Sequence, residues 1–120
     1  MKVIDYKDQK AMESTCGALK ESFTSDVGFA RAQMHKGFSV PHYHKKLTEY
    51  YLVLEGTGIL RVKPNGGGKA EVVNLKKGII VKIDPGEVHQ SRSDGDLIVE
   101  DVSFPAWAEE DEFVVKKSLF

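Results

Sequence analysis

Three of the four histidines lie in two short segments that could together bind a metal ion. His42 and His44 are two residues apart, and residues i and i+2 of a β-strand project from the same face, so both imidazoles can point to one place. Glu49 begins the next apolar run, and His89 follows a proline–glycine turn later in the chain. Three neutral imidazoles and one carboxylate suit one divalent transition metal, and Fe, Mn, Ni, Co, Cu and Zn all accept this ligand set.

A metal ion that prefers six ligands would keep two positions open at such a site. Water, dioxygen or a substrate oxygen can be polarised there. The competing interpretation is a polar barrel interior without metal. It would leave buried polar groups in need of other partners, at about 1 to 3 kcal/mol for each unsatisfied group, so we favour the metal site.

Other residues are weaker candidates for chemistry. We expect His35 to lie on the surface or at a strand end, and Cys16 has no matched base that would make it a nucleophile. Tyr51 shares the strand parity of Glu49, and Ser91 that of His89; each could line a pocket or simply fill the barrel. Trp107 either covers a barrel mouth or packs on the outer sheet, and we favour the second.

The elements that must position these residues are β-strands. From Val27 onward, short runs rich in Val, Ile, Tyr and Phe are broken by glycine and proline, which predicts an antiparallel all-β barrel or sandwich over residues 26–120 as a single domain. Residues 1–25 are more polar and predict an N-terminal arm. Turn sequences such as Asn65-Gly66 and Asp94-Gly95 predict that hairpin follows hairpin in the second half. The acidic run at 109–112 predicts a solvated loop.

Composition narrows the class of protein. The chain has 120 residues, of which 41% are hydrophobic and 29% charged, with a formal net charge of -1. These values favour one soluble domain and give no indication of nucleic acid as a partner. One cysteine allows no internal disulfide, and no apolar run resembles a signal peptide or a membrane span, so we expect a cytoplasmic protein. The runs YYLVL and GIIVKI are apolar on both faces, which favours a homodimer.

At these residues the sequence resembles the cupin superfamily, in its small single-domain form (the cupin_2 type conserved barrel). His42, His44, Glu49 and Gly56 match its first motif, and Gly78, Gly86 and His89 match its second. The resemblance covers about residues 30–103 and implies an antiparallel double-stranded β-helix, the jelly-roll or cupin barrel, whose histidines and glutamate bind the metal. The chain departs from the usual pattern at Gly37, Asp84 and Ser93, which affects turns and one neighbouring contact but removes no ligand.

The arrangement of the motif is most similar to the metal-binding domain of phosphomannose isomerases. The resemblance implies a metal-dependent enzyme acting on a small polar molecule, with isomerase-like or dioxygenase-like chemistry and no catalytic residue assigned. An isomerase of sugar phosphates would need cationic groups for phosphate, and the sequence places none of Arg31, Arg61 and Arg92 in the pocket. The alternative is a non-catalytic metal- or metabolite-binding module, although the N-terminal arm is too short and too poor in basic residues for a DNA-binding domain.

Overall fold

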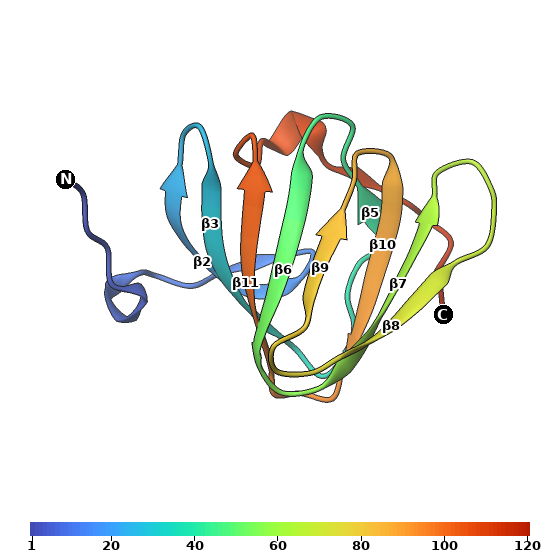
Figure 1. The fold of residues 1–120 in the computed structure, drawn as a ribbon, viewed down its shortest axis with the longest axis horizontal. Helices are drawn as coiled ribbons and strands as arrows, with labels where there is room; N and C mark the ends of the chain where they lie inside the picture. The colour runs from blue at the N-terminus through green and yellow to red at the C-terminus, as the bar shows by residue number, and fades with distance from the viewer.

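The computed structural model describes residues 1–120, and its regular secondary structure is almost entirely β-strand, arranged in two sheets (Figure 1). Figure 1 looks onto the outer face of the larger sheet. All the ladders between its strands are antiparallel. In spatial order its six strands are β1 (Met12–Ser14), β2 (Gly17–Thr24), β3 (Gly28–Met34), β11 (Leu97–Phe104), β6 (Thr48–Glu55) and β9 (Ile80–Ile83).

The smaller sheet is also antiparallel. Its five strands, in spatial order, are β12 (Phe113–Val114), β5 (His42–Tyr43), β10 (Glu87–Ser93), β7 (Gly58–Pro64) and β8 (Glu71–Leu75). Of these, β10, β7 and β8 lie to the right of β9 in Figure 1. The remaining elements are short: β4 (Gly37–Phe38) and the 3₁₀-helices η1 (Tyr6–Asp8) and η2 (Glu109–Asp111). None of the helical segments has the length and hydropathy needed to cross a membrane. The two sheets form the β-sandwich of a jelly-roll barrel, which confirms the predicted fold class.

Most turns in the second half of the chain connect the two sheets, so the prediction of hairpin following hairpin is wrong. Only the Asn65-Gly66 turn closes a true hairpin, between β7 and β8. The Asp94-Gly95 turn carries the chain from β10 in the smaller sheet to β11 in the larger one, and the connections β5–β6, β8–β9 and β9–β10 cross in the same way. Turn sequence predicts that the chain reverses, but it does not determine which sheet the next strand joins.

The segment predicted as an N-terminal arm contributes two strands to the larger sheet. Residues 12–24 form β1 and β2, and β2 pairs with β3 along most of its length. The sheet therefore begins well before the predicted boundary at residue 25. The alternation of β2 is hard to see in the sequence because Glu21 is polar and faces the interior beside Leu19. A strand that lines a polar cavity loses the apolar alternation by which strands are found.

The apolar core occupies one end of the space between the sheets. Its buried side chains come from both sheets and are Met34, Tyr51, Val53, Leu60, Leu75, Ile83, Leu97 and Val99. Along β6 the inward residues change from Val53 and Tyr51 in this core to Glu49 near the other end of the strand. Gly56, with φ of +83°, makes the sharp turn after β6, and a side chain there would collide with the backbone of Asp96. The apolar core thus holds one end of strands such as β6, and the other end of β6 carries the polar side chain of Glu49.

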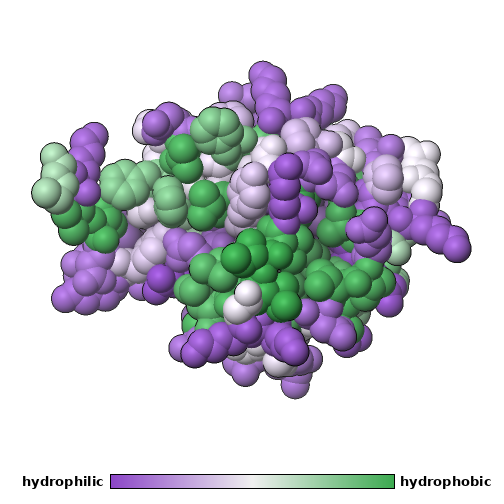
Figure 2. Space-filling model, in the orientation of Figure 1, coloured by the Kyte–Doolittle hydropathy of each residue, from purple (hydrophilic) through white to green (hydrophobic).

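The outer face of the larger sheet carries an exposed apolar patch. Leu52 on β6 and Ile80 on β9 are cross-strand partners, and their exposed fractions are 36% and 68%. Tyr50 lies next to them on the same face, with 39% exposed. Figure 2 shows apolar side chains gathered on this side of the molecule. The second apolar face that the sequence predicts for YYLVL is therefore turned to solvent in the single chain.

Candidate metal centre

The four residues predicted as ligands lie together between the sheets. His42, His44, Glu49 and His89 are all buried, and their ligand atoms lie within 4.8 Å of one another. His42 and His89 are directly paired across β5 and β10 of the smaller sheet. Glu49 projects from β6 of the opposite sheet. The structure therefore brings together the predicted set, and metal binding by it stays a prediction.

The backbone fixes the direction of all three imidazoles. The Nδ1 of His42 lies 2.8 Å from the carbonyl oxygen of Val40, and the Nδ1 of His89 lies 3.0 Å from that of Glu87. The Nδ1 of His44 lies 2.7 Å from the carbonyl oxygen of Asp111, far along the chain. A carbonyl can only accept, so each Nδ1 carries the proton and donates it. In the neutral form of each ring, Nε2 then carries the lone pair, directed toward the centre of the cluster.

The atoms that face the centre lack hydrogen-bond partners. His44 Nε2, His89 Nε2 and Glu49 Oε1 are buried and make no hydrogen bond. Glu49 Oε1 lies 3.2 Å from His89 Nε2 and 3.9 Å from His44 Nε2. Leaving buried polar atoms unsatisfied costs about 1 to 3 kcal/mol each, and a cation would satisfy all of them at once. The residues present therefore fit a divalent metal ion.

The electrostatics of the cluster couple Glu49 to His89. Burial alone would raise the pKa of Glu49, but its contact with His89 and the neighbouring histidines holds that pKa below its usual value. Burial alone would lower the pKa of His89, yet Glu49 raises it above 6.5. For His42, burial and the charge of His89 lower the pKa to about 4. At neutral pH His42 is therefore an unprotonated ligand, whereas His89 keeps its second proton to a higher pH than a free imidazole does, and a metal ion would compete with that proton.

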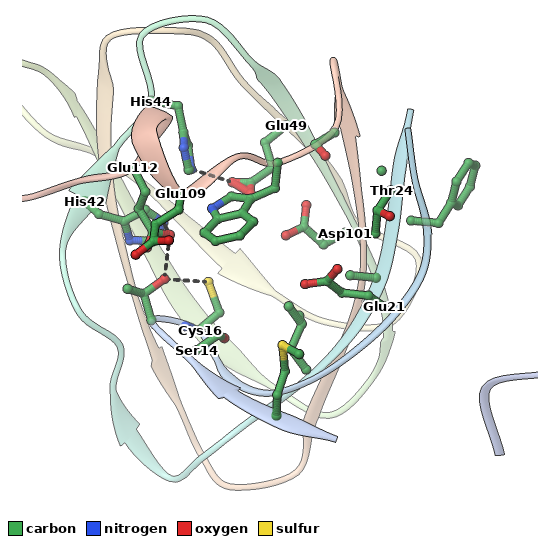
Figure 3. A pocket seen from close by; sticks show the side chains of 18 of the residues that line it. Ser14, Cys16, Glu21, Thr24, His42, His44, Glu49, Asp101, Glu109 and Glu112 are labelled. Carbon is green, nitrogen blue, oxygen red and sulfur yellow. Dashed lines mark hydrogen bonds and ion pairs between the residues drawn. The ribbon is translucent and has the colours of Figure 1, made fainter. Parts of the chain in front are cut away.

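A cavity of about 280 Å³ opens beside this cluster (Figure 3). Strands β1, β2, β3 and β11 line one side, and the segment after β11 closes the other. His42, His44 and Glu49 reach its wall. Asp101 also faces it, and burial, assisted by the charge of Glu49, raises the pKa of the Asp101 carboxyl well above its usual value. A positive charge placed beside Asp101 would favour its ionised form.

The acidic run near the C-terminus belongs to the site, so the prediction of a solvated loop is wrong for Asp111 and Glu112. Asp111 is buried, and its carboxylate accepts the backbone N–H groups of Lys45, Lys46 and Leu47 in the turn between β5 and β6. Glu112 lines the cavity, accepts a hydrogen bond from Thr15, and lies 3.8 Å from His42 Nε2. Nothing in the local sequence distinguishes these two carboxylates from the exposed Glu110.

The structure places each of the residues that were weaker candidates for chemistry. His35 is exposed just beyond β3 and contacts Glu13 at 3.0 Å, outside the cluster. Tyr51 is part of the apolar core and does not line the main cavity. Burial raises the pKa of the Cys16 thiol, which leaves it a poor nucleophile.

Trp107 lines the cavity, which contradicts our preference for packing on the outer sheet. Ser91 lies away from the main cavity and donates to Met34 Sδ at 3.3 Å.

All three arginines considered for phosphate binding lie outside the cavity. Arg31 pairs with Glu100 at 3.2 Å. Arg61 donates to the carbonyl oxygen of Leu119 and stacks over the ring of Phe120, which also lies near Arg92. Arg31 thus lies in an ion pair outside the cavity, and Arg61 and Arg92 pack against the C-terminal segment.

Comparison with known proteins supports the architecture. Residues 30–103 match a family model described as a cupin domain. A protein of known structure from Planctomyces limnophilus is 22% identical with a TM-score of 0.77, covering 94% of this chain and 96% of that one. The nucleoside dehydratase Pac13 of Streptomyces is 15% identical with a TM-score of 0.79, covering 96% and 91%. Oxalate decarboxylase from Bacillus subtilis is 13% identical with a TM-score of 0.75, covering 93% of this chain but 31% of that one. No curated protein shows significant similarity to the chain.

Proposed function

The chain belongs to the cupin domain family, and on that premise we propose that it is a metal-dependent enzyme acting on a small polar molecule. His42, His44, Glu49 and His89 would hold one divalent transition metal. The observation that carries the proposal is the convergence of unpartnered, buried ligand atoms on the wall of a cavity large enough for a small molecule. Two of the similar structures are enzymes, a dehydratase and a decarboxylase, which supports catalysis on this fold.

When bound, such an ion supplies Lewis acidity or, if redox-active, a site for dioxygen chemistry. The chain's own residues exclude water and handle protons. Glu112 reaches the cavity from the segment after β11, and Glu21 reaches it from β2. Carboxylates at these positions can accept a proton from a bound molecule or return one to it. We name no single catalytic residue among them.

The residues of the cavity wall limit the class of substrate that the cavity can bind. Isomerisation of a sugar phosphate requires cationic groups for the phosphate, and no lysine or arginine lines the cavity. We therefore do not propose a phosphorylated substrate, although isomerase-like chemistry on an uncharged or cationic molecule stays open beside dioxygenase-like chemistry. One similar structure, a variant of the Streptomyces protein PAC13, is described with uridine, which supports a small-molecule ligand here.

A non-catalytic metal- or metabolite-binding module is the second candidate, because a cavity beside a metal cluster can hold a small molecule without converting it. The two candidates differ in one observable. An enzyme converts its ligand and needs the metal to do so, whereas a binding module is only stabilised by its ligand.

The proposal is tested by elemental mass spectrometry on protein purified without chelator or histidine tag. We expect about one metal ion per chain, lost in His42→Ala and in His89→Ala because three ligands hold a metal far less tightly than four. His35→Ala is the matched control, since His35 is exposed and outside the cluster.

The identity of the metal then decides the chemistry to be screened. Iron would direct a screen toward dioxygen reactions, and zinc, manganese or nickel toward Lewis-acid reactions. A wild-type chain without metal would contradict the proposed function.

We also propose a homodimer in the cytoplasm. The apolar patch of Leu52 and Ile80 supports the dimer, because a second copy would remove this surface from water. The single free cysteine and the absence of a disulfide are consistent with a reducing compartment.

A further inference from the structure

The wall of the cavity is strongly acidic. Its titratable lining has no lysine or arginine and consists of two histidines of the cluster, the Cys16 thiol and six carboxylates, Glu13, Glu21, Glu49, Asp101, Glu109 and Glu112. Glu49 belongs to the metal centre, and Glu13 contacts His35. Even with Asp101 in its protonated form, the other three carboxylates, Glu21, Glu109 and Glu112, outnumber the two positive charges of a bound divalent ion, so the cavity favours cations over anions.

Two of these carboxylates face each other across a gap made by a small residue. Glu21 on β2 and Asp101 on β11 are both cross-strand partners of Ala30 on the intervening strand β3. Strands two positions apart in a sheet are separated by about 9 to 10 Å, and a methyl group fills little of that interval. Figure 3 shows both carboxylates directed into the same space. The three residues form what we call the acidic slot.

The acidic slot has no cation from the protein. Neither Glu21 nor Asp101 forms an ion pair, and Asp101 Oδ1 is buried without any hydrogen-bond partner. An unsatisfied buried carboxylate oxygen is unfavourable unless something else supplies a donor. The slot adjoins the metal cluster, since Asp101 and Glu49 line the same cavity.

An aromatic side chain lies on the same cavity. Trp107 lines it from the segment after β11, with 45% of its surface exposed. Indole faces attract ammonium and guanidinium groups, and tryptophan does so best among the aromatic residues. Carboxylates and an indole together select a positively charged nitrogen.

We propose that the molecule accepted by this cavity carries a positively charged amino group, which occupies the acidic slot of Glu21, Ala30 and Asp101. A polar group at its other end then lies at the metal cluster. Only the placing of the polar group at the metal cluster rests on the proposed function. The binding of the amino group does not, because the acidic slot is present whether or not a metal is bound. The substrate class is thus a small amine that also carries an oxygen.

The test uses metal-loaded protein and two probes that differ in one group, a four-carbon amino alcohol and the corresponding diol. Chemical-shift titration measures the affinity of each probe. We expect the amino alcohol to bind at least about tenfold more tightly than the diol, and its affinity to fall as salt is added. Glu21→Gln keeps the shape of the side chain and removes its charge. It should reduce the preference about tenfold while the metal content and the affinity for the diol stay unchanged.

Glu110→Gln is the matched control, because Glu110 is exposed and lies outside the cavity. Equal binding of the two probes, or no binding of the amino alcohol, would overturn the inference and leave the proposed function standing. A wild-type chain that holds no metal would overturn the proposed function, and the preference between the probes in that same protein would still decide the inference.

Discussion

Each histidine of the cluster is oriented by a backbone carbonyl rather than by another side chain. Val40 and Glu87 supply carbonyls two residues before their histidines, and Asp111 supplies one from the C-terminal segment. The local contacts follow from the strand geometry around His42 and His89. The contact of His44 depends instead on where the C-terminal segment packs. Two ligands are therefore set locally, and one is set by the tertiary fold.

Metal uptake should release a proton and weaken as the pH falls. Burial alone would lower the pKa of His89, but Glu49 raises it above its ordinary value of 6.5, so a metal ion competes with a proton up to a higher pH than at a free imidazole. Affinity should rise as the pH rises through the raised pKa of His89. In the metal-free chain the same shift stabilises the fold fully below pH 6.5, and this stabilisation is lost as the pH rises through the raised value.

Calorimetric titration with zinc in buffers of different ionisation enthalpy measures this proton. We expect the number of protons released per ion to decline from about one below the pKa of His89 toward zero well above it. His42 should contribute none, because its pKa of about 4 leaves it neutral throughout this range. Zinc affinity that does not change from mildly acidic to mildly alkaline pH would contradict the coupling of Glu49 to His89.

At the scale of residues, the sequence was sufficient for the cluster but not for the cavity around it. Alternation predicts that His42 and His44 share a direction, and the family motifs add Glu49 and His89. Asp101 and Glu112 belong to no motif, and they face the cavity only because distant segments pack there. Such positions depend on contacts between residues far apart in the chain, which spacing alone does not encode.

The turn between β5 and β6 depends on a single carboxylate from elsewhere in the chain. Asp111 accepts three consecutive backbone N–H groups, from Lys45, Lys46 and Leu47. Asp111→Ala should lower the free energy of unfolding by about 2 to 4 kcal/mol, because charge-assisted hydrogen bonds are lost and buried donors remain. Chemical denaturation measures this change.

The same variant should also weaken metal binding, since the turn joins His44 to Glu49 and the carbonyl of Asp111 holds the His44 ring. Glu110→Ala is the control: this neighbouring side chain is exposed, and its removal should change neither stability nor metal affinity. If Asp111→Ala behaves like Glu110→Ala, the carboxylate does not support the turn.

Strands with dense apolar runs could be predicted from the sequence, whereas a strand that lines the polar cavity could not. β6 and β9 carry dense apolar runs, which identify them as strands from composition alone. β2 turns Glu21 toward the interior, so its alternation is masked and residues 1–25 resemble an arm. The placement of each strand in one sheet or the other was equally hidden, because a short turn is compatible with a hairpin and with a crossing.

On the scale of the whole molecule, the exposed apolar face predicts self-association. Leu52→Glu and Ile80→Glu each place a charge on the patch, and either should convert a homodimer to a monomer in light scattering, since a buried unpaired charge opposes association. Val72→Glu is the matched control, because Val72 is exposed on β8 of the other sheet. A wild-type chain that is monomeric at high concentration would contradict the dimer.

Part of the cavity wall comes from segments of the chain that contribute no ligand to the metal cluster. All four predicted ligands lie within residues 30–103, the region matched by the family model. Glu21, Trp107 and Glu112 lie outside it, on the two flanking segments. Substitution of Glu21 or Trp107 can therefore change which molecule fits without altering a metal ligand, whereas Asp111 in the C-terminal flank also orients the ligand His44. Natural selection can thus alter specificity at Glu21 and Trp107 without changing any of the four ligands.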